Sequence, residues 1–130
     1  MAVAEISLII STYNQPVALK HVLAGVALQT QTPREVLIAD DGSDETVARV
    51  VKDWSHRLPK LEHVWHEDRG FRKTVILNEA IARAHGDYIV LLDGDCVPHP
   101  RFIEDHANLG EPDCWVQGRR SFINESSVAN

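Results

Sequence analysis

Short apolar runs alternate along the chain with segments whose apolar residues recur every three or four positions. The runs are apolar over most of their length, which is typical of strands that are buried on both faces of a parallel sheet. They cover Ile6–Ile10, Val36–Ala39 and Tyr88–Leu92, with a weaker run at Leu61–Trp65. The pattern predicts four strands.

Amphipathic helices are predicted between these strands, because the apolar residues there fall on one helical face. The first face holds Leu19, Val22, Leu23 and Val26, the second Val47, Val50, Val51 and Trp54, and the third Ile76, Leu77, Ala80, Ile81 and Ala84. A short helix is predicted over Phe102–Asn108, and Gly86 is predicted to cap the third helix. We expect a further strand at Cys114–Gln117, and we expect Trp54 and Trp65 to belong to the core.

Strands that alternate with helices predict an α/β fold, with a mostly parallel sheet that helices cover on both faces. Neither repeats nor linkers interrupt the pattern, so residues 1–130 are predicted to form a single domain. Ligands of such sheets bind beyond the carboxyl ends of the strands. Polar segments follow the first, second and fourth predicted strands, and we expect them to meet at that edge.

Composition and charge narrow the function. The net charge of −6 excludes a general nucleic-acid binder, since no basic stripe is present to displace phosphate counterions. Cys96 and Cys114 lack the spacing of a metal or redox motif; free thiols are favoured over a disulfide. Residues 1–10 do not resemble a secretory signal, and no apolar run approaches the ~20 residues of a membrane span. We expect a cytoplasmic protein.

The sharpest chemical feature is Asp93-Gly-Asp95, directly after the fourth predicted strand. Strand side chains alternate, so residues two apart point the same way, and paired carboxylates suit hard cations such as Mg²⁺ or Mn²⁺. A polar turn would use the same residue types. Two carboxylates at a sheet edge nevertheless repel one another unless something neutralises them, which favours a metal site.

Two further polar segments are candidates for ligand binding. Asp40-Asp-Gly-Ser-Asp44 has residues that cap a helix, but capping does not require three carboxylates, and one of them is placed to accept hydrogen bonds from a nucleoside. Arg69, Arg72 and Lys73 lie where a helix begins, against the preference of the helix dipole. They are either a solvated loop paired with Glu67 and Asp68, or a set of cations that neutralises a diphosphate.

Together these segments resemble the family-two glycosyltransferases of the Rossmann-like GT-A fold. Four segments carry the resemblance, in register along the chain: Ile9–Asn14, Leu37–Ser43, Asp68–Thr74 leading to Leu77–Ile81, and Leu91–Cys96. The Arg-Gly-Phe-Arg version of the third segment resembles the branch that makes lipopolysaccharide and capsule, including chondroitin-polymerase-like domains.

The resemblance implies an inverting transfer from a nucleotide sugar, with a UDP-sugar favoured, to a glycan acceptor. It places Thr12 and Tyr13 against the nucleobase, Asp41 on the uracil, Asp40 beside the nucleoside, Arg72 or Lys73 at the diphosphate or sugar, Asp93 at the ribose or sugar and the metal, and Asp95 on the metal, Mn²⁺ or Mg²⁺. Peripheral association with a membrane is a further expectation for this branch.

One departure from the family pattern concerns the general base. In the family an Asp or Glu downstream of the D-x-D serves as the base, and the 35 residues after Asp95 are too few to reach it. Val116–Arg120 resembles the strand that follows the D-x-D. We therefore expect a C-terminally truncated enzyme whose exposed sheet edge favours self-association.

Two alternatives belong to other functional classes. A non-catalytic module that binds a nucleotide or a partner protein would also lack the base. Ile89–Val97 also resembles the first motif of haloacid-dehalogenase-type phosphatases, but those enzymes need a downstream lysine, and no lysine follows Lys73. The glycosyltransferase hypothesis accounts for more of the chain than either alternative.

Overall fold

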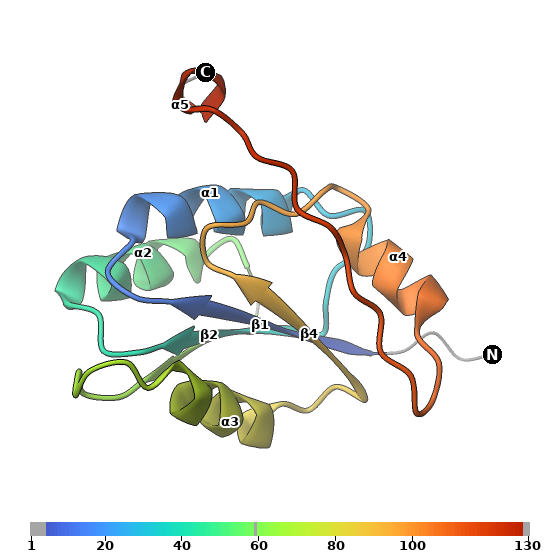
Figure 1. The fold of residues 1–130 in the computed structure, drawn as a ribbon, viewed down its shortest axis with the longest axis horizontal. Coiled ribbons are helices and arrows are strands. Elements are labelled where there is room, and N and C mark those ends of the chain that lie inside the picture. Colours follow the sequence, from blue (N-terminus) through green and yellow to red (C-terminus); the bar gives the residue numbers. More distant parts are fainter. Residues whose placement is uncertain (1–4, 59, 129–130) are drawn as a thin grey trace.

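The computed structural model describes residues 5–58 and 60–128 and contains one four-stranded parallel sheet. Its strands are β1 (Ile6–Thr12), β2 (Glu35–Asp40), β3 (Leu61–Trp65) and β4 (Tyr88–Asp93). They lie in the order β3-β2-β1-β4, with β1 and β2 in the centre (Figure 1). The predicted parallel α/β sheet is confirmed, and β1, β2 and β4 each continue into the polar residues that follow the apolar run.

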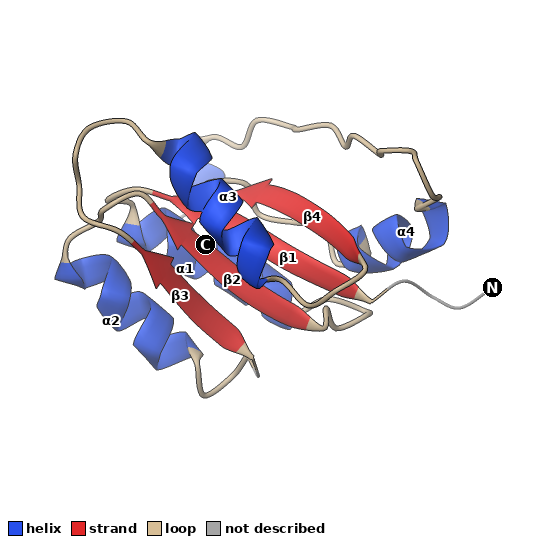
Figure 2. Cartoon of the chain, turned by 90° about the horizontal axis from the view of Figure 1, so that it is seen from below, coloured by secondary structure: helices blue, strands red, loops and turns tan. Residues whose placement is uncertain are grey.

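Helices pack against both faces of the sheet (Figure 2). They are α1 (Pro16–Ala27), α2 (Glu45–Trp54), α3 (Lys73–Arg83) and α4 (Phe102–Leu109), whereas the short α5 (Glu125–Val128) lies away from the sheet (Figure 1). Leu8 and Ile10 of β1 join α1, α2 and Ile103 of α4 in the larger apolar cluster, whereas Ile9 joins α3 in the smaller one. Successive side chains of β1 point to opposite faces of the sheet, so this strand contributes to both apolar clusters. Within the described part of the chain, no helix is long and apolar enough to cross a membrane.

The cover over β4 is less complete than the sequence predicts. Val90 is buried in the larger cluster, but Ile89 is 37% exposed and Leu91 is 55% exposed. Leu91 pairs in register with Ile9, so it lies on the same sheet face as α3, which covers β1 and β2 but not β4. The predicted helices on both faces of the sheet are confirmed, but β4 at this edge has one face open to solvent although its sequence is apolar.

Several smaller expectations are also wrong. Trp65 is half exposed rather than in the core, although Trp54 does pack against the larger cluster. Ile81 is 38% exposed because α3 buries mainly Ile76 and Ala80. Gly86 does not cap α3, which ends at Arg83 with Ala84 as its C-cap. The Gly86 amide donates to the Ser7 hydroxyl, and a side chain at this position would meet the Glu5 carbonyl. Residues 114–117 form no strand.

The uneven cover predicts different costs for two leucines on the same sheet face. Leu37→Ala is expected to lower the free energy of unfolding by about 2–5 kcal/mol, because the side chain is fully buried and leaves a cavity. Leu91→Ala, the matched control, is expected to cost less than about 1 kcal/mol, because its side chain is already half in water. Urea unfolding of both variants measures the difference, and equal costs would contradict the open face of β4.

Candidate functional site

A cavity of about 450 Å³ lies at the carboxyl edge of the sheet, where ligands of parallel sheets bind. Six of the eight site residues predicted from the sequence line it: Thr12, Tyr13, Asp41, Lys73, Asp93 and Asp95. They come from the ends of three strands, β1, β2 and β4, and from the start of α3. Asp40 and Arg72 lie outside this lining. The sheet topology thus brings together residues that are up to 83 positions apart in the sequence (95 minus 12).

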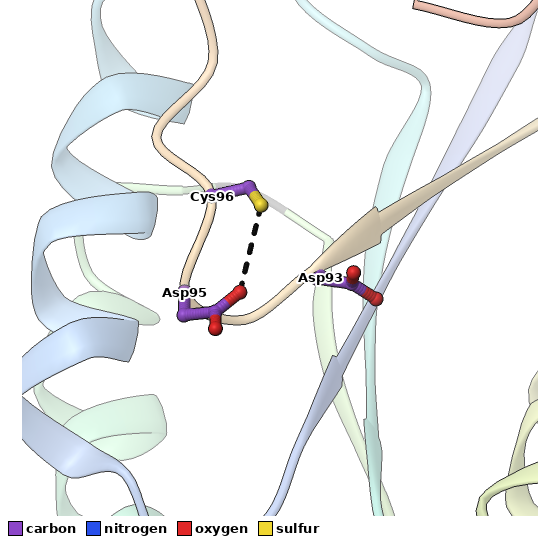
Figure 3. Close-up of side chains that lie close together, drawn as sticks. All are labelled: Asp93, Asp95 and Cys96. Carbon is purple, nitrogen blue, oxygen red and sulfur yellow. Dashed lines mark hydrogen bonds between the residues drawn. The ribbon is translucent and has the colours of Figure 1, made fainter. Parts of the chain in front are cut away.

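The acidic turn after β4 has a fixed backbone. The Cys96 amide donates to the Asp93 carbonyl at 3.0 Å, which closes the turn, and the Gly94 amide donates to the Ser11 carbonyl at 2.7 Å. A side chain at Gly94 would place its Cβ 2.4 Å from that carbonyl oxygen, so only glycine fits. One ligand atom each of Asp93, Asp95 and Cys96 lies within 4.8 Å of the other two (Figure 3).

Asp93 is surrounded by donors. Lys73 Nζ lies 3.0 Å from its Oδ1, the Ser11 hydroxyl donates to the same oxygen at 3.3 Å, and Arg120 Nη1 lies 3.9 Å from Oδ2. The hydrogen bond from Lys73 is the main cause that lowers the pKa of Asp93 below its ordinary value; partial burial opposes it. Because the folded-state pKa is lowered, the pair favours folding at neutral pH, and that contribution disappears as the pH falls through the folded-state pKa.

Replacing Lys73 by methionine is expected to raise the pKa of Asp93 toward the ordinary aspartate value of about 3.9, because its main hydrogen-bond donor is lost. The chemical shift of the Asp93 carboxyl carbon, followed by NMR through an acid titration, measures this. Lys52→Met, which removes an exposed lysine of α2, is the control and should leave the titration unchanged. An unchanged Asp93 titration in Lys73→Met would contradict the ion pair.

The two aspartates after β2 point to different places. Asp41 lines the cavity; His66 Nε2 lies 2.6 Å from its Oδ1, and the Arg72 amide donates to its Oδ2 at 2.9 Å. Asp40 is fully buried outside the lining, where it accepts from the Ser43 amide at 2.9 Å and pairs with His63 at 2.8 Å. Asp40 therefore shapes the loop, whereas Asp41 faces the cavity.

Tyr13 joins two loops across the cavity. Its hydroxyl donates to Asp68 Oδ2 at 2.6 Å, a bond that raises the pKa of Tyr13 and lowers that of Asp68. The 66–71 loop passes so close to Gly42 that a Cβ there would lie 2.5 Å from the backbone of Asp68. Gly42 also has a φ of +96°, which side chains rarely adopt. The two loops are therefore packed backbone to backbone.

The cations at the start of α3 also separate into two roles. Lys73 lines the cavity and reaches Asp93. Arg72 turns its guanidinium to the Glu67 carbonyl, to which Nη2 donates at 2.8 Å, and uses its amide for Asp41. Arg69 pairs with Glu67, as the solvated-loop interpretation has it. Lys73 is thus the member of this set whose charge faces the cavity.

Four residues that form hydrogen bonds to the site residues were not predicted from the sequence. They are His63, His66, Asp68 and Ser11. His66 and Ser11 lie at the carboxyl ends of β3 and β1, so the rule that placed the aspartates could have included them. His63 lies within β3, and its contact with Asp40 depends on how β2 and β3 pair, which the sequence pattern does not specify.

The turn after β4 fits a divalent cation by its chemistry. Asp93 and Asp95 provide carboxylate oxygens, the ligands that Mg²⁺ and Mn²⁺ take. Thr12 beside them is 8% exposed, and its hydroxyl has no hydrogen-bond partner in the described structure. Buried polar groups are rarely left unpaired. The hydroxyl and the carboxylates together indicate a polar occupant at this end of the cavity.

The strand order defines a Rossmann-like α/β domain with an acidic carboxyl edge, and comparison with known proteins names its class. The model of the family "Glycosyl transferase family 2" matches residues 7–127. The chain belongs to this family, and the resemblance inferred from its motifs is confirmed.

Two similar proteins are named as a hyaluronan synthase and a chondroitin synthase. The chain is 30% identical over 126 residues to a hyaluronan synthase of Pasteurella multocida, covering 95% of the chain and 13% of the relative. It is 31% identical over 124 residues to a chondroitin synthase of Escherichia coli, covering 93% and 18%. The chain therefore spans less than a fifth of the length of these relatives.

Solved structures share the fold. A complex of S. aureus TarS with UDP-GlcNAc has a TM-score of 0.67 and 25% identity, with 80% of this chain and 30% of that chain covered. The mannosyltransferase PcManGT of Pyrobaculum calidifontis, in complex with GDP-Man and Mn²⁺, has a TM-score of 0.64 and 27% identity, with 77% and 30% covered. The expected GT-A, Rossmann-like architecture is confirmed.

Proposed function

We propose that the chain binds a nucleoside-diphosphate sugar, with a UDP-sugar favoured, through a divalent metal ion, and supplies it for transfer to a glycan acceptor. The observation that carries this proposal is one cavity lined by Asp41 at one strand end and by Asp93 and Asp95 at another. Family membership supports a sugar nucleotide as the donor. Binding of UDP-GlcNAc and of GDP-Man with Mn²⁺ by two structural neighbours supports both donor and metal.

The nucleobase end of the site lies at Asp41 and Tyr13. Asp41 Oδ1 lies 2.6 Å from His66 Nε2 and its Oδ2 accepts from the Arg72 amide, and a carboxylate acceptor suits a base with a ring N–H, as uracil has. Tyr13 is 47% exposed at the cavity, where its ring can stack on the base, and Thr12 lies beside it. Asp40 acts on the nucleoside indirectly, by holding the loop that carries Asp41.

The phosphate end lies at Lys73 and the acidic turn. Lys73 moves its charge from Asp93 toward the diphosphate when the nucleotide arrives, and Arg72 supports the loop. Asp95 and Asp93 would hold Mn²⁺ or Mg²⁺, with Asp93 also near the ribose or sugar. Such an ion offsets the charge that builds up on a departing nucleoside diphosphate.

The transfer itself is proposed as an attack of an acceptor hydroxyl on the anomeric carbon with inversion. Which carboxylate takes the hydroxyl proton is not assigned to any residue of this chain: Glu104 and Asp105, the acidic pair downstream of Asp95, are on α4 and pair with Arg101. The chain is the donor half of the reaction in this proposal.

Calorimetric titration with UDP tests the proposal. Binding is expected in the presence of Mn²⁺ and should weaken at least about tenfold in EDTA, because no metal ion then lies between the diphosphate and the carboxylates of Asp93 and Asp95. Uridine, which lacks the diphosphate, is the matched ligand control and should bind with little dependence on the metal. UDP binding that is equal with and without the metal would contradict the metal site, and absence of binding would contradict the donor site.

A further inference from the structure

The thiol of Cys96 lies within metal-ligand range of the two carboxylates at the end of β4. One ligand atom each of Asp93, Asp95 and Cys96 falls within 4.8 Å of the others. Bonds of about 2.0–2.3 Å place two ligands of one ion at most roughly 4.6 Å apart. Only a small side-chain movement therefore separates this arrangement from one that encloses an ion.

The backbone of the turn, rather than a chance rotamer, brings the thiol to this place. The Cys96 amide is bonded to the Asp93 carbonyl, so residues 93 and 96 meet across the turn. The turn is tied to β1 through Gly94 and Ser11 at 2.7 Å. Figure 3 shows the sulfur of Cys96 facing the Asp95 carboxylate, with Asp93 at the end of β4.

Asp95 and Cys96 are hydrogen-bonded to each other, and Arg120 also interacts with the thiol. Oδ1 of Asp93 is occupied by Lys73 and Ser11. Within residues 5–58 and 60–128, the only hydrogen bond to Asp95 comes from the Cys96 thiol, at 3.5 Å. A thiol is a weak donor, so little hydrogen-bond energy is lost when a cation replaces the thiol proton between Cys96 and Asp95.

An independent observation points to an occupant beside the turn. The Thr12 hydroxyl is buried and has no partner in the described structure, and Thr12 lines the same cavity as Asp95. Its Oγ1 lies 3.3 Å from the position of a Cβ built on Gly94, so it adjoins the turn directly. An unpaired buried hydroxyl destabilises the folded state, and a hydrogen bond to a ligand or to its bound water would offset that loss.

We propose that Cys96 is a third protein ligand of the divalent ion held by Asp93 and Asp95, so that the site prefers borderline metals such as Co²⁺ and Zn²⁺ to Mg²⁺. The inference rests on the metal site of the proposed function. Oxygen ligands alone favour hard cations, whereas a thiolate shifts selection toward softer ones. Coordination releases the thiol proton to solvent, as for other cysteine ligands. Because Asp93 is shared with Lys73, Asp95 and Cys96 make the stronger bonds.

Titration of the metal-free chain with Co²⁺, followed by absorption spectroscopy, tests this. The wild-type protein is expected to develop a sulfur-to-cobalt charge-transfer band in the near ultraviolet. Cys96→Ser should lose that band and bind Zn²⁺ at least about tenfold more weakly relative to Mg²⁺, the lower end of what loss of a supporting group costs a metal site. Cys114→Ser, which removes the other, exposed thiol, is the matched control and should keep the band.

The outcomes separate this inference from the proposed function. Co²⁺ binding without the band, or a band that persists in Cys96→Ser, would overturn the role of Cys96. If such a result came with Mn²⁺-dependent UDP binding, the proposed function would stand and the thiol ligand alone would fail. A band lost in Cys96→Ser but without any UDP binding would support the metal site and reject the nucleotide. Absence of Co²⁺ binding would overturn the thiol ligand. Circular dichroism shows whether each variant is folded.

Discussion

Asp95→Ala is expected to weaken Mn²⁺-dependent UDP binding by about tenfold to a hundredfold, the range that loss of a metal's supporting group produces. The expectation follows from the partners of the two carboxylates. Asp93 is engaged by Lys73, Ser11 and Arg120, whereas Asp95 contacts a thiol alone among the described residues. Asp95 is therefore the carboxylate that is freest to coordinate an ion. Calorimetry with Mn²⁺ measures the effect.

The exposed Asp53 of α2 offers the matched control for Asp95→Ala. Asp53→Ala removes the same charge from the protein and should leave UDP binding unchanged. If Asp95→Ala and Asp53→Ala weakened UDP binding equally, the cause would be the change in net charge and not the loss of a metal ligand. Unchanged binding in Asp95→Ala would show that the diphosphate is held without this carboxylate, and Lys73 would then be its main partner.

Gly42→Ala is expected to lower both stability and UDP binding, because two separate constraints meet at this residue. The φ of +96° alone costs a side chain about 1–2 kcal/mol. In addition, the Cβ would lie 2.5 Å from the backbone N and Cα of Asp68, so the 66–71 loop must move. That movement would disturb the bond between Tyr13 and Asp68 and the support that His66 gives Asp41.

Gly70→Ala separates these two causes. Gly70 has a φ of +87°, but a Cβ there meets nothing within 4 Å. The Gly70 variant thus reports the backbone cost without the collision. Thermal unfolding should give a clearly lower Tm for Gly42→Ala, by roughly 4 °C for each kcal/mol of difference. Equal Tm values would mean that the loop adapts to the new methyl group at no cost.

The order of strands and helices was predictable because each element has its own apolar signature. Core strands such as β2 are apolar between their end residues, and the apolar residues of the helices recur at the helical period. The exposure of Leu91 and Trp65 was not predictable in this way. Burial depends on which element covers a strand, and α3 is placed over β1 and β2 by packing that no local pattern encodes.

The candidate site shows the same division. Acidic residues at strand ends could be placed at one edge from topology alone, and the cavity lining agrees for Asp41, Asp93 and Asp95. The sequence could not say which partner each carboxylate takes, since His66 and Asp41 are 25 residues apart. Alternation between neighbours could have separated Asp40 from Asp41, because adjacent residues at the end of a strand point to opposite sides.

The loop after β2 is held in place by hydrogen bonds within the protein. Asp40 accepts from the Ser43 amide, the Asn14 amide donates to the Ser43 hydroxyl, and the Asp44 amide donates to the Asn14 side chain, all at 2.8–2.9 Å. Ordering a side chain on binding costs about 0.5–1.5 kcal/mol, and this end of the cavity is spared that cost. The long side chains of Lys73 and Arg120 are 40% and 68% exposed, so they would have to become ordered when a ligand binds. In the proposed function, the base of the nucleotide would bind to a rigid loop after β2, and the phosphates would bind to side chains that change conformation.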